Sequence, residues 1–373
     1  MFKGSKMKKF VLILLVVMIT SFAIAGVIFV GEYGKDNFSI LRNDSHPDLR
    51  PNDAVDVNEE KTEDISSINS IYVSTPSENI NFIPSDASEI KAHFYGYYST
   101  NNKEYKPEFT ATVSGDELRI KVDYKPNISM LRYSSNLKLD IYLPKTYSNN
   151  LQVNTSSGSI SIDEIIKLES FICKTTSGSL TAKLVNAKKA DLGASSGSMK
   201  ISGTYDNFNF NATSGSFNSD GITAKYASLG TSSGSIKINA STDELKLHST
   251  SGSLTADPVS AKRCTLSSSS GRITLKGAPG DVDATLTSGD IDLEYSEYDN
   301  NINIRTSSGS TGIKLPQNSE FHLKYDTSSG SGRCDFPITL NGAQVRNSIE
   351  GTVISDRNSI TVKSSSGDLN IIG

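Results

Sequence analysis

Apolar residues recur at fixed distances from a repeated glycine in the C-terminal part of the chain. The phrase Ser-Ser-Gly-Ser-Ile first occurs at residues 156–160, and related phrases return at intervals of 18 to 21 residues, with one final interval of 37. Positions seven, five and three before the glycine are mostly apolar or small, as in the copy with Leu229 and Thr231. Positions two and four after it are apolar again, as at Ile236 and Ile238. A spacing of two indicates a strand with one inward face on each side of the glycine.

The inward parity changes by one between these two arms, so the chain must turn a corner at Ser-Gly for both arms to face one interior. Glycine enters the left-handed region without a clash of a Cβ atom, and this predicts a left-handed corner in every copy. The predicted corners are Gly158, Gly178, Gly197, Gly215, Gly234, Gly252, Gly271, Gly289, Gly309, Gly330 and Gly367.

Self-similarity with a period of about 19 residues is typical of a solenoid. Neither arm can bury its apolar face alone, but stacked copies can, through parallel ladders along the axis. The pattern therefore predicts an all-β protein whose residues 151–373 form a parallel β-solenoid of about 11–12 coils, with an irregular coil at 334–358. The rod would be on the order of 50 Å long.

Residues 68–150 lack the phrase but alternate at period two, for example at 118–122 and 137–143, with a hairpin signal at 114–117. A first coil exposes a strand edge that needs cover, so we predict that 68–150 form an antiparallel β cap. Four tyrosines, Tyr95, Tyr97, Tyr98 and Tyr105, fall here. Packing of a loop against the cap is the favoured interpretation, and a sugar-stacking surface is the alternative.

The N-terminus predicts a membrane anchor. Residues 10–30 carry no charge and are numerous enough to span a bilayer. The basic residues 1–9 precede them, which favours a cytoplasmic N-terminus and an extracytoplasmic solenoid on a single-pass protein of the cell membrane. A signal peptide cleaved near Ala25 is the alternative. Residues 31–67 are acidic and poor in large apolar residues, as expected for a disordered spacer.

Composition changes this picture little. The net charge of −4 gives no general attraction to nucleic acid. The three cysteines, Cys173, Cys264 and Cys334, are too scattered for a disulfide framework. Cys173 and Cys264 fall at inward positions and are expected to be small core residues.

Two segments carry a resemblance to a known family. The stretch from Leu137 to Pro144 followed by Leu151 to Ile160, and the closing stretch from Ile360 to Leu369, resemble the bacterial putative-adhesin family of unknown function. The resemblance covers about residues 68–373. It implies a β-solenoid of Ser-Gly-Asp/Ser-Ile coils, often with an N-terminal membrane anchor, and it brings no catalytic residues.

Candidate chemistry is sparse. The four histidines are dispersed, and no zinc, P-loop, redox or nucleophile-elbow motif occurs. The densest acidic spot consists of Asp281, Asp283, Asp290 and Asp292. We interpret these residues as part of a solvated face, and paired catalytic carboxylates or cation ligands are the alternative. Serine precedes all eleven corner glycines. We expect these hydroxyls to stabilise the turns, with a hydroxyl array for glycan or ice as the alternative.

These observations predict a non-catalytic, membrane-anchored envelope rod for adhesion, scaffolding or sensing, with another envelope protein or cell-wall glycan as partner. A glycan-active β-helix enzyme, a lyase or hydrolase, is the alternative. We expect no catalytic, cofactor-binding or metal-binding residues. The last strand, with Leu369, Asn370 and Ile371, is either a free docking edge or is covered by the phrase-free stretch 334–357 folding back as a cap, which is the favoured alternative.

Overall fold

The computed structural model describes residues 51, 53–102, 105–125, 133–341 and 347–373. Contacts divide the chain into Met1–Asn52 and Asp53–Gly373, and the second unit is the subject below. The predicted cytoplasmic residues 1–9, the predicted transmembrane helix 10–30 and the spacer up to residue 50 lie outside the described residues. In the described part of the chain, no helix is long and apolar enough to cross a membrane.

Each Ser-Gly repeat folds into one coil of a parallel solenoid, as predicted. Leu229 and Leu247, before the corner, are each 1% exposed, and Ile236 and Ile238, after it, are 1% and 0% exposed. Both arms therefore face one interior, which forms a single apolar core along the rod. We call the surface of the strands before each corner the long face and that of the strands after it the short face.

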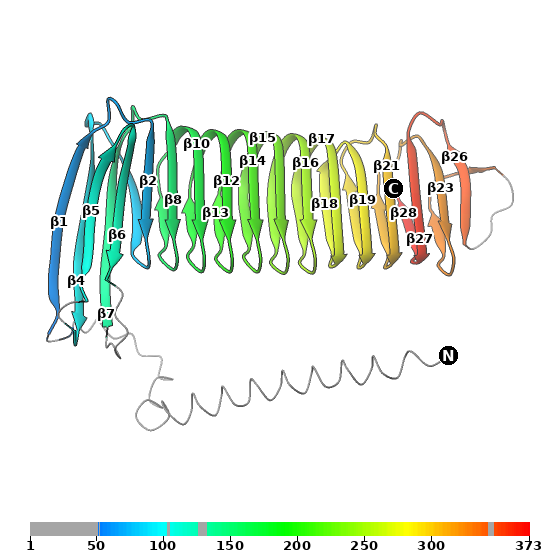
Figure 1. Cartoon of the computed structure of the whole chain (residues 1–373). Helices are drawn as coiled ribbons and strands as arrows, with labels where there is room; N and C mark the ends of the chain where they lie inside the picture. The colour runs from blue at the N-terminus through cyan, green and yellow to red at the C-terminus, as the bar shows by residue number, and fades with distance from the viewer. Residues whose placement is uncertain (1–50, 52, 103–104, 126–132, 342–346) are drawn as a thin grey trace, which may run out of the picture. The chain divides into compact units, whose positions relative to one another are not determined.

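The central coils stack with every strand in parallel register on its neighbour (Figure 1). Their strands are β8 (Asn150–Thr155), β9 (Ile160–Ile162), β10 (Ile166–Thr175), β11 (Leu180–Ala182), β12 (Val185–Ala194), β13 (Met199–Ile201), β14 (Gly203–Ala212), β15 (Phe217–Thr231), β16 (Ile236–Ser249), β17 (Leu254–Ser270), β18 (Ile273–Ala278), β19 (Asp281–Ser288), β20 (Ile291–Tyr295), β21 (Ile302–Ser308) and β22 (Thr311–Lys314).

The N-terminal end combines an antiparallel cap with one solenoid coil. Its strands are β1 (Val55–Asp64), β2 (Ser70–Thr75), β3 (Asn79–Ser85), β4 (Glu89–Thr100), β5 (Pro107–Ser114), β6 (Glu117–Tyr124) and β7 (Tyr133–Pro144). β4 pairs antiparallel with β1 and β7, and β5 pairs antiparallel with β6. β2 and β3, however, are inserted as a parallel coil: β2 lies between β6 and β8, and β3 between β7 and β9.

The predicted disordered spacer 31–67 is therefore wrong at its C-terminal end. Val55–Asp64 pairs along its whole length with β4. Its acidic side chains are mostly exposed, and charged residues on an edge strand block pairing with another chain. The acidic composition that suggested disorder is thus that of a protected edge strand.

The C-terminal end also contains an inserted coil and an antiparallel cap. Its strands are β23 (Phe321–Thr327), β24 (Gly332–Cys334), β25 (Thr339–Leu340), β26 (Ser348–Val353), β27 (Ser359–Ser366) and β28 (Leu369–Ile372). The last coil of the sequence is not last in space: β27 lies between β21 and β23, and β28 between β22 and β24.

The predicted docking edge at Leu369, Asn370 and Ile371 is therefore wrong. These residues pair with Thr311, Gly312 and Ile313 on one side and with Gly332, Arg333 and Cys334 on the other. The irregular segment instead provides cover, because β26 pairs antiparallel with β23 and with β25. The phrase-free stretch therefore does act as a cap, but it covers the coil of β23 and not, as the favoured alternative had predicted, the last coil of the sequence.

The corner glycines lie where expected, but the predicted reason for them is mostly wrong. Of the eleven, only Gly271, Gly289 and Gly309 have a positive φ. At the others, such as Gly234, an added Cβ would overlap the carbonyl oxygen of the stacked corner, here that of Gly215. Close approach of backbone to backbone between coils, rather than a left-handed turn, requires glycine in most copies.

Candidate functional site

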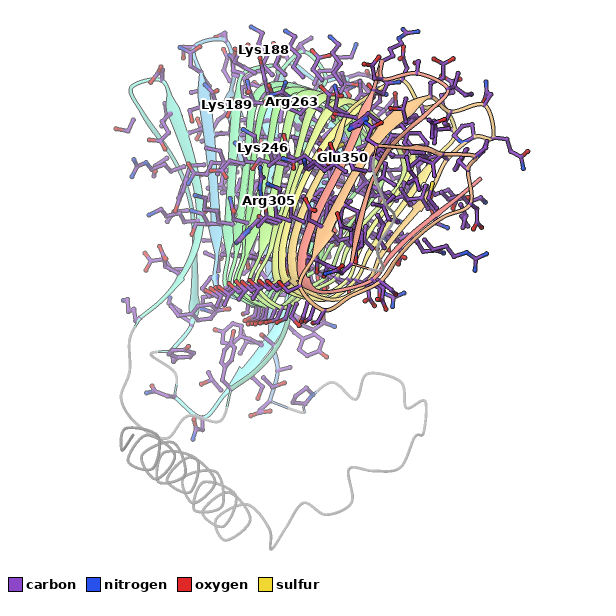
Figure 2. All side chains as sticks on the ribbon, turned by 90° about the vertical axis from the view of Figure 1, so that its right-hand side faces the viewer. Lys188, Lys189, Lys246, Arg263, Arg305 and Glu350 are labelled. Atoms are coloured by element: carbon purple, nitrogen blue, oxygen red, sulfur yellow. The ribbon has the colours of Figure 1, made fainter. Side chains whose placement is uncertain are left out.

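The serines of the corners are held by backbone pairing between coils. The amide of Ser233 donates to the carbonyl of Thr213 at 2.9 Å, and that of Ser251 donates to the carbonyl of Ser232 at 2.8 Å. The side chains that directly precede the glycines are mostly exposed. Figure 2 shows rows of oxygen-tipped side chains along the lower edge of the solenoid. This regular backbone ladder supports the structural interpretation of the serines.

A second set of hydroxyls, three residues before the glycine, closes the corners from inside. Ser249 is 0% exposed, and its Oγ accepts a hydrogen bond of 2.6 Å from the amide of Gly252. Thr231 does the same for Gly234 at 2.9 Å. The sequence pattern indicated only apolar or small residues at these positions and so missed their role in closing the corners. Their recurrent Ser or Thr was the available signal, because a polar side chain at an inward position needs a partner.

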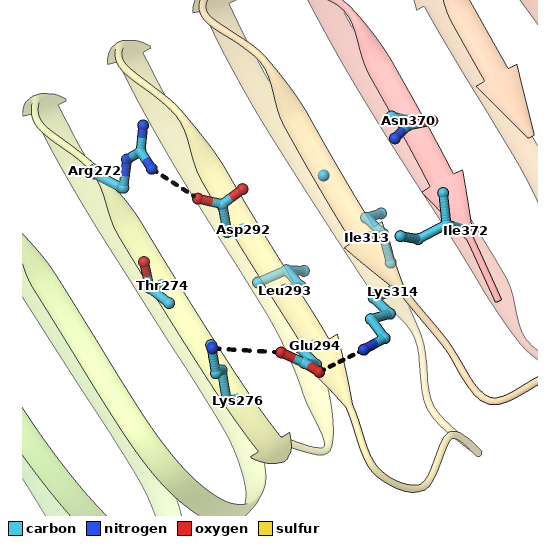
Figure 3. Close-up of a pocket in the computed structure, with 11 residues that line it drawn as sticks. Arg272, Thr274, Lys276, Asp292, Leu293, Glu294, Ile313, Lys314, Asn370 and Ile372 are labelled. Carbon is cyan, nitrogen blue, oxygen red and sulfur yellow. Dashed lines mark hydrogen bonds and ion pairs between the residues drawn. The ribbon is translucent and has the colours of Figure 1, made fainter.

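A groove of about 480 Å³ lies on the short face (Figure 3). Its wall is built by β18, β20, β22 and β28, whose outward side chains alternate with the buried core residues. Gly312 provides the low point, because it has no side chain between Asp292 and Asn370 in the neighbouring coils. The groove is thus created by a missing side chain in a ladder of larger ones. We call it the short-face groove.

Charges of both signs line the short-face groove. Arg272 contacts Asp292 at 3.5 Å and Asp290 at 2.9 Å. Glu294 lies between two lysines, at 3.5 Å from Lys276 and 2.9 Å from Lys314 (Figure 3). The hydrogen bond and positive charge of Lys314 lower the pKa of Glu294.

Glu294 therefore accepts a hydrogen bond from Lys314. A general acid for glycoside hydrolysis needs a raised carboxyl pKa, which an apolar setting supplies. The ion-paired Glu294 has the opposite environment. The groove offers fixed donors and acceptors to a polar ligand, together with an amide from Asn370 on the inserted last strand.

The predicted acidic spot is divided between two faces. Asp281 and Asp283 lie on the long face, where they accept hydrogen bonds of 2.9 Å from the Asn301 amide and from the Asn303 side chain. Asp290 and Asp292 lie on the short face beside Arg272. Within the residues that the structure describes, no group of three or more His, Cys, Asp or Glu could hold a metal ion.

The predicted tyrosine cluster is mostly packed. Tyr105 stacks on Tyr124 with ring centroids 5.4 Å apart and meets Tyr133 edge-on at 5.2 Å. Tyr95 stacks on His93 and donates to Asp140 at 3.1 Å. Glu78 is 2% exposed and accepts a short hydrogen bond from Tyr124. Burial, with this hydrogen bond, raises the pKa of the Tyr124 hydroxyl. These contacts support packing of the cap rather than sugar stacking.

Three solved structures of bacterial proteins are similar to this one. A protein of Clostridium sporogenes ATCC 15579, described as a putative cell adhesion protein, is 12% identical, with 85% of this chain and 99% of that chain covered and a TM-score of 0.19. An adhesin, described as putative, of Bacteroides fragilis NCTC 9343 is 11% identical, with coverage of 85% and 97% and a TM-score of 0.27. One of Parabacteroides distasonis ATCC 8503 is also 11% identical, with the same coverage and a TM-score of 0.33.

Among curated proteins, no significant match to this chain exists. The family model Toastrack DUF4097 matches residues 68–242 and again residues 204–372. The two overlapping matches span the inserted first coil, the repeats and the inserted last coil. This chain belongs to the Toastrack DUF4097 family.

Proposed function

We propose that this protein is a non-catalytic, adhesin-like rod of the cell envelope that binds its partner along its sides. The supporting observation is that antiparallel strands cover both faces at one end, through β4 and β5, and the long face at the other end, through β26. The sides are then the extended surface for contacts, and they carry polar side chains in rows at the strand spacing of about 4.8 Å. A repeating surface of this kind suits a repeating ligand.

Cell-wall glycan is the partner that the short-face groove favours. The groove has the volume of a small-ligand site, and its charged and amide groups provide several hydrogen-bond donors and acceptors. Sugars are recognised through such groups, and the groove is open along the short face of neighbouring coils. A protein of the envelope is the alternative partner, and the experiments below distinguish it from glycan.

The groove proposal is tested by co-sedimentation of the purified full-length chain with insoluble cell-wall glycan. We expect the wild type to sediment and Lys314→Glu to lose most binding, because this variant places two carboxylates beside each other and removes a donor. Lys237→Glu, an equal charge change on an exposed site of the same face, is the matched control. Equal binding of all three chains contradicts the groove. If crosslinking in intact cells captures one protein and no glycan, that protein and not glycan is the partner.

We further propose that residues 10–30 anchor the protein in the cell membrane, with residues 1–9 in the cytoplasm and the solenoid outside. The uncharged length and the basic flank support this topology. Protease added to intact cells should digest the solenoid and leave an epitope at the N-terminus protected. Protection of the solenoid in intact cells, with digestion only after lysis, contradicts the topology.

A further inference from the structure

Six charges of alternating sign line the edge of the long face at one position in six successive coils. They are Glu169, Lys188, Asp206, Lys225, Asp243 and Lys262. Neighbouring charges pair in twos within the chain, at 2.8 Å for Lys188–Glu169, 2.8 Å for Lys225–Asp206 and 2.7 Å for Lys262–Asp243. Every one of these side chains keeps at least 40% of its surface exposed. Each group can therefore accept another partner of opposite charge from outside.

A row of charges that alternates in sign and has an even number of members is complementary in charge to the same row read in the opposite direction. Two copies placed face to face and parallel would set each acid opposite the same acid. Reversing one copy sets every acid opposite a base along the whole row. The matching operation is a two-fold axis parallel to the strands that passes between β14 and β15, and such an axis makes the same patch bind itself.

Two further rows of the long face obey the same symmetry. The strands β10, β12, β14, β15, β16 and β17 are in register, so that Lys189, Asn207, Tyr226 and Glu244 lie in one row. Reversal about the same axis sets Lys189 opposite Glu244. In the next row toward the Ser-Gly corner, Asp191 and Lys246 lie in the same two coils as Lys189 and Glu244, and the reversal sets them opposite each other as well. In these rows, no two like charges of the six coils come opposite each other.

The centre of this pattern carries an exposed aromatic residue. The tyrosine Tyr226 is 51% exposed, and between the row of alternating charges and the Ser-Gly corner the strands β14 and β15 present only uncharged side chains on the long face, among them Asn207 and Ser228. Reversal places Tyr226 of each copy against Asn207 of the other. An aromatic centre with charges around it is the arrangement in which binding energy concentrates in protein interfaces. Figure 2 shows Lys188 at the edge of the face and Lys189, Arg263 and Lys246 below it on the same side.

We infer that the long face between β10 and β17 is the interface of an antiparallel homodimer. Six coils at about 4.8 Å and six residues at about 3.3 Å give a flat patch of roughly 600 Å² per copy. Two such patches bury roughly 1,200 Å², the lower end of specific interfaces. The dimer is accordingly weak and favoured by low salt, because exposed charge pairs are screened. It places the two Asp53 ends at opposite ends of the pair, which suits contact between two cells if the anchor proposed above is present.

The test is sedimentation velocity of the full-length chain in mild detergent over a range of concentrations at low salt. We expect reversible dimers whose dissociation constant rises with salt. Glu244→Lys and Lys189→Glu each place like charges together at two symmetric points, and each should raise the dissociation constant about tenfold or more. Carrying both substitutions in one chain restores both pairs and should restore the dimer. Tyr226→Ala should weaken it by a similar factor, because truncation of a central aromatic residue is costly.

Lys237→Glu on the short face controls for net charge and should leave the dimer unchanged. Circular dichroism and melting curves establish that each variant is folded. A chain that is monomeric at all concentrations at low salt overturns the inference. A dimer that neither single reversal weakens overturns it as well, as does failure of the double variant to recover when both single variants are weakened. These outcomes are independent of glycan binding, which uses the short face.

Discussion

The carbonyl oxygen of Gly215 occupies the space that a Cβ atom on Gly234 would need. The carbonyl carbon of Gly215 would lie only 2.7 Å from such a Cβ, which is closer than real side chains approach backbone. Each corner therefore rests directly on the next, and the stacked glycines set the spacing of the coils. The hydrogen-bond ladder of the corner depends on this close approach.

Replacing Gly234 by Ala should destabilise the protein by about 2 kcal/mol or more, because the added methyl group must push two coils apart. Thermal and urea unfolding measure the effect. Gly221→Ala is the matched control: it lies in the same strand, β15, with open space around its Cβ position, and should change stability by less than about 0.5 kcal/mol. Superimposable curves for both variants contradict the stacked-corner explanation.

Replacing Leu229 by Asp should destabilise the protein by about 3 kcal/mol or more, since it leaves an unpaired charge in the core. Its neighbour Ser228 points outward, and Ser228→Asp should stay within about 0.5 kcal/mol of the wild type. Both are compared by urea unfolding at a concentration dilute enough to keep the chain monomeric. Equal tolerance of the two substitutions would mean that the inward register is wrong.

Replacing Ser249 by Ala should cost about 1 kcal/mol, because the amide of Gly252 loses its hydrogen-bond partner. The cost is modest because Ala194 and Ala212 occupy the equivalent position in two other coils, so the corner can close without a hydroxyl. Ser251→Ala, at an exposed position of the same corner, is the control and should be nearly neutral. A larger loss from Ser251→Ala would show that the outer serines, and not the inner hydroxyls, stabilise the corner.

Replacing Ile371 by Asp should strongly destabilise the C-terminal coils, because Ile371 is 0% exposed and β28 is paired on both sides. We expect a loss of about 3 kcal/mol or more. Asn370→Asp changes the adjacent, exposed residue and should be tolerated. Hydrogen exchange gives an independent measurement, since the amides of β28 should exchange slowly in the monomer. Fast exchange there would restore the free-edge hypothesis.

Thiol labelling of the native protein should modify Cys334 and spare the other two cysteines. Cys173 and Cys264 are 0% exposed, and burial raises the pKa of each thiol to about 12. At neutral pH they hold almost no thiolate, the reactive form. Cys334 is only partly buried, and we expect it to react at least about tenfold faster. In urea all three should react alike, and equal rates in the native protein would contradict the buried positions.

The sequence by itself determined the repeating part of the fold. A period of two within each arm and a glycine at about every 19 residues prescribe which side chains face inward and where the chain turns. These are local properties, repeated many times, and stacking neighbours is the only way for such coils to bury their apolar faces. Leu229, Ile236 and the two buried cysteines accordingly lie where the pattern put them.

Only the tertiary structure decided the order of the terminal coils. Sequence order placed Ile371 at the end of the rod, but its coil is inserted between coils that are neighbours in sequence, as is the coil of β2 and β3 at the other end. The repeat phrase is the same whichever coil it stacks on, so periodicity cannot specify neighbours where the chain makes a long return. The inserted β28 is also what brings Asn370 to the short-face groove.

The reason for the glycines and the surface patterns likewise required the stacked structure. A glycine needed for a turn and one needed for close approach look identical in a sequence, and only the position of the Gly215 carbonyl separates them at Gly234. The alternating charges from Glu169 to Lys262 are 18 or 19 residues apart and become neighbours only when coils stack in register. Contacts between residues that are distant in sequence depend on that register. The register itself is set by many weak pairings along the whole rod.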